Sequence, residues 1–163
     1  MTAIELLPYD PRWPLRYQEE AGRIRRALGH RVLLLEHVGS TSVPDLAAKP
    51  IIDILLAVRD SSDEASYSLD LEESGYRFVL REPDWFEHRL FKGKHDEVNL
   101  HVFSDGTDEI DRMIRFRDHL RSDESDRLLY GSTKRELATH TWESVQDYAD
   151  AKSDVIEDIL ARS

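Results

Sequence analysis

Two apolar runs separated by a glycine-serine turn are the feature that most limits how this chain folds. Residues 32–38 and 51–58 are rich in Leu, Ile and Val, and their length and composition are typical of buried strands. Gly39-Ser40 follows the first run and permits a sharp turn, because glycine has no side chain. Backbone amides exposed at such a turn bind phosphate oxygens. The pattern predicts a strand, an anion-binding turn and a second strand.

The turn and the second run supply the first candidate site residues. Gly39, Ser40, Thr41 and Ser42 are predicted to bind phosphate through their amides and hydroxyl groups. Asp53 lies among aliphatic residues, where an ionised carboxylate is costly unless it is paired, hydrogen-bonded or bound to a metal. We predict that Asp53 is a catalytic and metal-binding residue. The alternative is an ordinary turn followed by a structural aspartate.

A third segment carries polar side chains at alternate positions. Residues 97–103 place Glu97, Asn99 and His101 on one face of a predicted strand and aliphatic residues on the other. If this strand lies beside the Asp53 strand, His101 meets Asp53 over the turn and the two hold a metal ion. Imidazole with carboxylate suits Mn, Zn or Fe better than Mg, which prefers oxygen ligands. The alternative for His101 is a hydrogen-bonded histidine of the sheet.

These residues resemble a known signature. A Gly-Ser followed, after twelve residues, by Asp53 in an aliphatic strand is similar to the nucleotidyltransferase superfamily pattern, in which Gly-Ser precedes Asp-hydrophobic-Asp. Within that superfamily, residues 36–53 resemble the GrpB family, relatives of which are fused to some dephospho-CoA kinases. The similarity extends over almost the whole chain, from Tyr9 to Lys152. It implies metal-dependent transfer of a nucleotidyl group from a nucleoside triphosphate to a small acceptor, with Mg, Mn or Zn.

One departure from the superfamily pattern bears on activity. Leu55 stands where the second carboxylate of Asp-hydrophobic-Asp is expected. Two divalent cations a few ångströms apart need several anionic ligands, so the departure argues against a two-metal reaction. A catalytically inactive module that binds a nucleotide or phosphate ligand is therefore the alternative function. Metal-assisted hydrolysis of a phosphorylated metabolite would use the same residues.

Basic residues are the second requirement for a phosphate site. Lys49 precedes the Asp53 strand, and Arg89 lies in a run that is typical of a strand, where its guanidinium can hold phosphate through two bonds. The family resemblance adds Arg117 and Lys134 as phosphate-binding candidates. A basic residue of this kind, taken alone, is more often an exposed or ion-paired side chain, so the prediction depends on these residues converging in the fold. His37 is expected either to orient the turn or to contact the ligand.

Composition limits the partners. A net charge of −11 disfavours binding to extended nucleic acid, which relies on basic residues, whereas a small phosphorylated ligand or nucleotide remains compatible with a local basic pocket. The chain has no cysteine, so a metal site must use His, Asp or Glu. No run approaches the ~20 apolar residues that cross a bilayer. We expect a cytoplasmic protein without a membrane partner, and the sequence does not indicate its oligomeric state.

The layout predicts one domain over residues 1–163, of mixed α/β (α+β) class. It is expected to be nucleotidyltransferase-like, with a mixed sheet of about five strands and with an N-terminal helix and C-terminal helices packed on it. Besides the strands above, we expect strands over 76–80 and 88–93, and helices over 15–28, 61–74, 108–121, 124–139 and 142–161. Lys152 is expected to reach from the last helix toward the site.

Overall fold

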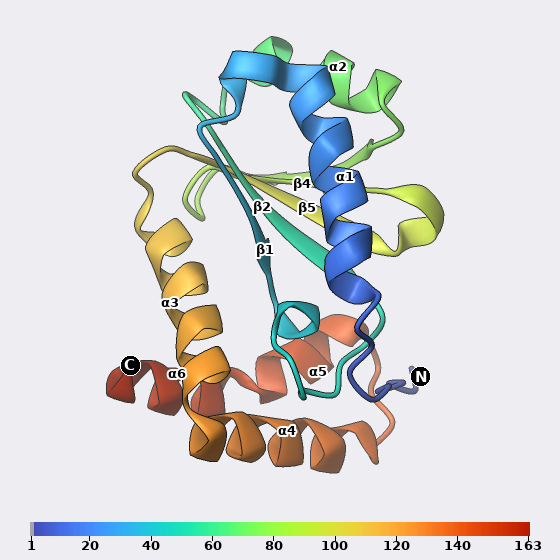
Figure 1. The fold of residues 1–163 in the computed structure, drawn as a ribbon, viewed down its shortest axis with the longest axis vertical. Coiled ribbons are helices and arrows are strands. Elements are labelled where there is room, and N and C mark those ends of the chain that lie inside the picture. The colour runs from blue at the N-terminus through green and yellow to red at the C-terminus, as the bar shows by residue number, and fades with distance from the viewer. Residues whose placement is uncertain (1) are drawn as a thin grey trace.

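A mixed five-stranded sheet forms the centre of the molecule in the computed structural model, which describes residues 2–163 (Figure 1). The strand order is β1-β2-β5-β4-β3, in which β2 and β5 are parallel and the other neighbours are antiparallel. The strands are β1 (Leu34–Val38), β2 (Ile52–Val58), β3 (Arg77–Glu82), β4 (His88–Lys92) and β5 (Val98–Ser104). The predicted five-stranded mixed sheet is therefore confirmed.

Helices cover both faces of the sheet and one of its ends (Figure 1). One face packs against α1 (Trp13–Leu28) and α2 (Ser68–Glu73), and the other packs against α3 (Asp108–Ser122). The remaining helices lie at the end of the sheet, against the loop that follows β1; they are α4 (Glu124–Ala138), α5 (Val145–Ala151) and α6 (Ser153–Arg162). The N-terminal and C-terminal helices thus have the predicted positions.

Successive side chains of β2 point alternately to the two faces of the sheet, and the two faces differ in character. Ile52, Ile54 and Leu56 point toward α1 and are fully buried in the larger core. Asp53 and Leu55 belong to the opposite face, because successive side chains of a strand alternate. Leu55 is also fully buried, in the smaller core under α3, so this face changes from apolar to polar along a single strand.

No helix among residues 2–163 has both the length and the apolar character needed to cross a membrane.

Two predicted helices differ from those observed. The helix expected over 61–74 is shorter, because a 3-10 turn at Glu64–Ser66 precedes α2. The single helix expected over 142–161 is two helices that meet at Lys152. There the amide of Lys152 bonds to the carbonyl of Ala149, three residues earlier, and this tighter turn ends α5. Apolar spacing continues through the break, so periodicity alone did not indicate it.

Gly39 is the tightest point between the turn and the sheet. Its φ is +74°, a conformation that side chains disfavour, and a Cβ on it would lie 2.5 Å from Oδ2 of Asp53. Only glycine therefore allows the turn to close over the Asp53 carboxylate.

We expect Gly39→Ala to destabilise the protein by roughly 2 to 5 kcal/mol, because backbone strain adds to a clash with Asp53. The matched control is Gly106→Ala, which has φ +82° but no atom within 4 Å of the added Cβ, and which should cost about 1 to 2 kcal/mol. Urea unfolding at neutral pH measures both. Equal losses for the two variants would show that the approach to Asp53 contributes nothing.

Candidate functional site

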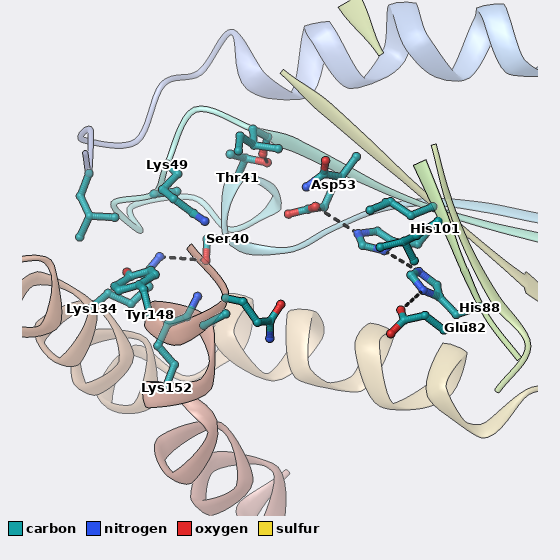
Figure 2. Close-up of a pocket in the computed structure, with 18 residues that line it drawn as sticks. Ser40, Thr41, Lys49, Asp53, Glu82, His88, His101, Lys134, Tyr148 and Lys152 are labelled. Atoms are coloured by element: carbon teal, nitrogen blue, oxygen red, sulfur yellow. Dashed lines mark hydrogen bonds and ion pairs between the residues drawn. The ribbon is translucent and has the colours of Figure 1, made fainter. Parts of the chain in front are cut away.

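A pocket of about 400 Å³ opens where the turn, the polar face of the sheet and the C-terminal helices meet (Figure 2). The sheet contributes Asp53, His101, His88 and Glu82 to its wall, and the C-terminal helices contribute Lys134, Tyr148 and Lys152. Ser40, Thr41 and Lys49 come from the turn and from the loop before β2. The pocket therefore joins segments that are far apart in the sequence.

The three hydroxyl groups of the turn have different surroundings. Thr41 donates to the carbonyl of Ile51 at 3.1 Å, and Ser42 donates to the carbonyl of Gly39 at 2.5 Å. Ser40 faces the pocket, where Nζ of Lys134 lies 2.8 Å from its Oγ. Of the three, Ser40 is thus the hydroxyl that a ligand reaches most directly.

His37 contacts the turn from the face of the sheet that α1 covers. Its Nε2 lies 3.0 Å from Oγ1 of Thr41, and its ring stacks on Tyr17 of α1 at 4.9 Å. Burial lowers the pKa of His37 to about 4, so the ring is neutral at physiological pH. Of the two roles expected for His37, this geometry matches the orienting one.

Four strands each contribute one residue to a hydrogen-bonded chain, here called the acid–imidazole chain. Nε2 of His101 lies 3.2 Å from Oδ1 of Asp53, and Nδ1 of His101 lies 3.0 Å from Nε2 of His88. Nδ1 of His88 in turn lies 2.8 Å from Oε1 of Glu82. The strands β2 and β5 are neighbours as expected, and they bring His101 against Asp53 on one face.

The acid–imidazole chain requires one positive charge. The carboxylates at its ends accept hydrogen bonds, so the ring nitrogens that face them are donors. If both rings were neutral, the two inner nitrogens would point lone pairs at each other across 3.0 Å. Either a proton or a metal cation removes this conflict. Burial and the neighbouring His101 lower the pKa of His88 to about 4, so the His88 ring itself is neutral at physiological pH.

Three lysines occupy the opposite end of the pocket (Figure 2). Lys134 is only 2% exposed, and Lys49 and Lys152 lie 5.6 and 4.7 Å from the centre of the Tyr148 ring. None of the ion pairs within residues 2–163 involves a lysine. We refer to Lys49, Lys134 and Lys152 as the lysine cluster.

The crowding of the lysine cluster alters its acidity. Burial, followed by the charges of neighbouring basic groups, lowers the pKa of Lys134 to about 7 and that of Lys152 to about 8. Burial also lowers the pKa of Lys49. Buried charges in proteins are normally paired. This cluster is therefore ready to accept an anion.

The two candidate arginines do not line the pocket. Arg89 is buried on the other face of the sheet and pairs with Glu64 at 2.6 Å and Glu87 at 3.1 Å. Arg117 pairs with Glu36 at 2.9 Å and donates to the carbonyl of His37 at 3.0 Å. Their guanidinium groups are occupied by carboxylates and backbone, which distinguishes them from the lysine cluster.

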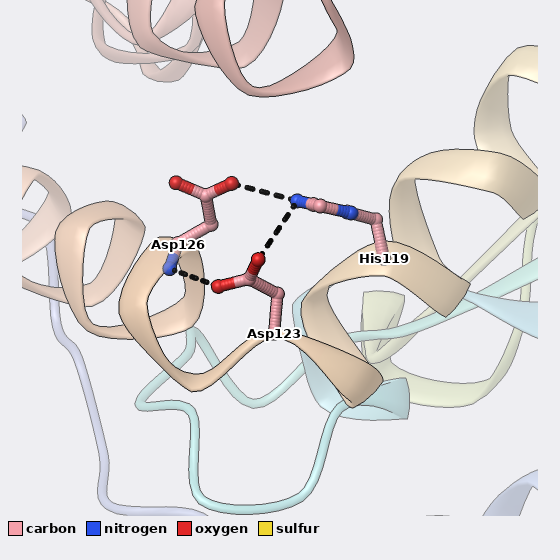
Figure 3. Close-up of side chains that lie close together, drawn as sticks. All are labelled: His119, Asp123 and Asp126. Carbon is pink, nitrogen blue, oxygen red and sulfur yellow. Dashed lines mark hydrogen bonds and ion pairs between the residues drawn. The ribbon is translucent and has the colours of Figure 1, made fainter. Parts of the chain in front are cut away.

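A second group of possible metal ligands lies outside the pocket, at the start of α4 (Figure 3). Nε2 of His119 lies 2.6 Å from Asp126 and 3.8 Å from Asp123. Asp126 also pairs with Arg162 at 2.6 Å, and Asp123 caps α4 by accepting from the Asp126 amide at 2.9 Å. The position of Asp126 is explained by its pairs with Arg162 and His119, and that of Asp123 by its role as a helix cap. The arrangement of these side chains is therefore accounted for without a metal ion.

Comparison with known proteins decides the family. The family model described as GrpB protein matches residues 3–162. The chain belongs to the GrpB family. A UPF0157 protein of Halalkalibacterium halodurans is 61% identical over 162 residues, which cover 99% of this chain and 83% of that protein. A UPF0157 protein of Streptomyces coelicolor is 46% identical, over 98% of this chain and 84% of that protein.

A crystal structure of the conserved protein GrpB from Enterococcus faecalis has the same fold. It superimposes with a TM-score of 0.83 at 31% identity, and the match covers 97% of this chain and 98% of that one. A dephospho-CoA kinase of Mycolicibacterium paratuberculosis is 28% identical over 188 residues, which cover 98% of this chain but 46% of the kinase. The similarity of GrpB-family sequences to dephospho-CoA kinases was expected from the sequence and is confirmed.

Sequence reasoning did not assign His88, Glu82 or Tyr148 to the site of this GrpB-family chain. Alternation within β4 places His88 and Leu90 on one face, so a polar position was visible, but the register that sets His88 beside His101 was not. Tyr148 belongs to an apolar helical stripe, and only the packing of α5 brings its buried side chain to the pocket wall.

The buried His37 ring should make folding sensitive to acid. Because its folded pKa is depressed from 6.5 to about 4, the unfolded chain binds the proton more readily, and its contribution to stability is lost as the pH falls from 6.5 toward 4. We expect His37→Gln to reduce that loss by up to about 3 kcal/mol. Urea unfolding of both proteins at pH 7 and 4.5 measures the difference. Identical pH dependence would contradict a neutral buried ring.

Proposed function

We propose that this GrpB-family chain binds a nucleoside triphosphate in the pocket and transfers its nucleotidyl group to a small acceptor, using one divalent metal ion. The observation that carries the proposal is the lysine cluster, three basic side chains with no carboxylate at ion-pair distance among residues 2–163, which face the Asp53–His101 pair across Ser40. The protein has a net charge of −11, so this cluster is a basic patch in an otherwise acidic molecule. Phosphate groups are ligands of matching charge, and ~400 Å³ lies within the range of small-molecule sites.

The donor atoms at Asp53 fit a single cation. Two ligand atoms at about 2.1 Å from a metal and roughly at right angles lie about 3 Å apart, and Oδ1 of Asp53 is 3.2 Å from Nε2 of His101. Asn99 is the cross-strand partner of Asp53, and its buried Oδ1 has no hydrogen-bond partner. These three residues would hold the ion, and the imidazole favours Mn or Zn over Mg.

The residues of the pocket have separate tasks in this proposal. A bound divalent ion would neutralise the charge that develops on phosphate oxygens during transfer. Lys49 and Lys152 hold the outer phosphate oxygens, and the turn after β1 places Ser40 beside them. His88 and Glu82 fix the ring of His101, in the way that outer hydrogen bonds orient metal-binding histidines. Transfer is then favoured by position and charge rather than by a large movement.

A second candidate is a module that binds a nucleotide or phosphate ligand without catalysing a reaction. Leu55 favours it, because this residue is fully buried beside Val38, Ala57 and Phe103 and leaves no carboxylate for a second ion. Such a module would need the lysine cluster and the turn but not the Asp53–His101 pair. The two candidates therefore differ in their dependence on metal.

Thermal unfolding with the common nucleoside triphosphates, each with Mg, Mn or Zn, tests the proposal. At a hundredfold excess over Kd we expect the melting temperature to rise by about 5 to 10 °C, because the ligand binds only the folded state. Asp53→Asn and His101→Ala should abolish the metal-dependent part, and Lys49→Met the nucleotide-dependent part. Lys94→Met, at an exposed lysine outside the pocket, is the control and should keep the full rise.

Other outcomes separate the candidates. A rise that requires no metal and survives Asp53→Asn would favour the inactive binding module. The absence of any response to a nucleotide in the unmodified protein would overturn nucleotidyl transfer and also nucleotide binding by an inactive module.

A further inference from the structure

Ser40 and Lys134 form a pair that phosphate binding alone does not explain. Nζ of Lys134 lies 2.8 Å from Oγ of Ser40 and 2.5 Å from the carbonyl oxygen of Ala47. The charged amine donates to both oxygens; once it has lost a proton, one N–H still bonds to the carbonyl and the lone pair is placed to accept the serine proton. The pair is held by α4 on one side and by the turn after β1 on the other.

The surroundings of Lys134 favour its neutral form. The side chain is 2% exposed and lies in no ion pair with a carboxylate of residues 2–163. Burial and the nearby charges of Lys152 and Lys49 lower its pKa to about 7, so that loss of the proton at neutral pH costs little. A buried amine of this kind is a general base, whereas an exposed lysine is not.

The position of Ser40 suits a nucleophile. Thr41 and Ser42 donate to backbone carbonyls. Ser40 is instead hydrogen-bonded to the amine of Lys134, and it lines the pocket. Lys49 and Lys152 line the same pocket and would stabilise negative charge on an electrophile bound there. A serine activated by an adjacent base and surrounded by cations has the parts that covalent catalysis requires.

We propose that Ser40 and Lys134 are a nucleophile and its general base, which together take a phosphoryl group from a phosphoric ester or anhydride. Oγ of Ser40 forms a bond to phosphorus as the bond from phosphorus to the leaving oxygen breaks. The hydroxyl proton passes to Nζ of Lys134 and from there to the leaving oxygen. This inference rests on the proposed phosphate pocket, and it adds a covalent step that the pocket's binding role does not contain.

A fluorophosphonate ester tests the pair directly. Attack by Oγ breaks the P–F bond, releases fluoride and leaves a stable adduct, which intact-protein mass spectrometry detects and peptide mapping locates. We expect one adduct, on Ser40, and none in Ser40→Ala. Lys134→Met should slow labelling by roughly a hundredfold or more, the size of a general-base contribution. Ser132→Ala and Lys94→Met, at exposed positions, are the matched controls and should label at the normal rate.

The pH dependence of labelling needs no variant and distinguishes base catalysis from a structural role of Lys134. The rate should rise as Lys134 loses its proton, with a midpoint near pH 7, and then level off. Charged and titratable groups face Lys134 from several elements: Lys49 before β2, Asp53 on β2, Tyr130 and Arg135 on α4, and Tyr148 and Lys152 at the end of α5. Their charges set the midpoint but do not remove the plateau.

Several results would overturn the pair: no adduct, an adduct on another residue, unchanged labelling in a folded Lys134→Met protein, or a rate that rises with pH without a plateau. The thermal-unfolding experiment separates this failure from that of the proposed function. Stabilisation by nucleotide without an adduct would remove the covalent step and leave the binding site. An adduct without stabilisation by any nucleotide would support the pair and remove the proposed function.

Discussion

The unpaired positive charge of the lysine cluster is the constraint that organises this molecule's site. Bringing three amines to one pocket costs free energy, since each loses hydration and repels the others. Among residues 2–163 no carboxylate forms an ion pair with these amines, although the chain has 33 acidic residues and the charge of Asp53 acts on Lys49 and Lys152 from a longer distance. Several acidic groups form arginine pairs instead, such as Arg89–Glu64 and Arg117–Glu36. Sites that retain such unfavourable charge are commonly functional ones.

The sheet supplies the opposite sign at the other end of the pocket. Asp53 lies against Gly39, and the acid–imidazole chain extends from it across four strands. A ligand in this pocket meets cations at one end and, at the other, a carboxylate and an imidazole that themselves need a positive charge. This polarity matches a phosphorylated ligand that arrives with a metal ion. Because Leu55 supplies no second carboxylate, the pocket has anionic ligands for one metal ion but not for two.

The sequence was informative where local pattern determines structure. The aliphatic runs gave β1 and β2, and alternation placed His101 on the polar face of β5, because the period of a strand is two. The register between strands that are distant in the chain could not be predicted from the sequence. The contact of His88 with His101 and the pairing of Arg89 with Glu64 depend on how the β3–β4 hairpin joins the sheet. The break at Lys152 was also hidden, since apolar spacing runs through it.

The contact between Ser40 and Lys134 spans 94 positions of the chain. A contact of such separation costs more conformational entropy to close than a local one, because a longer loop loses its freedom. During synthesis, the sheet residues emerge from the ribosome well before Lys134 and Lys152 do. The anion pocket is complete only when these two parts of the chain are packed together, so that occupancy by a ligand would report that both the sheet and the C-terminal helices have reached their native arrangement.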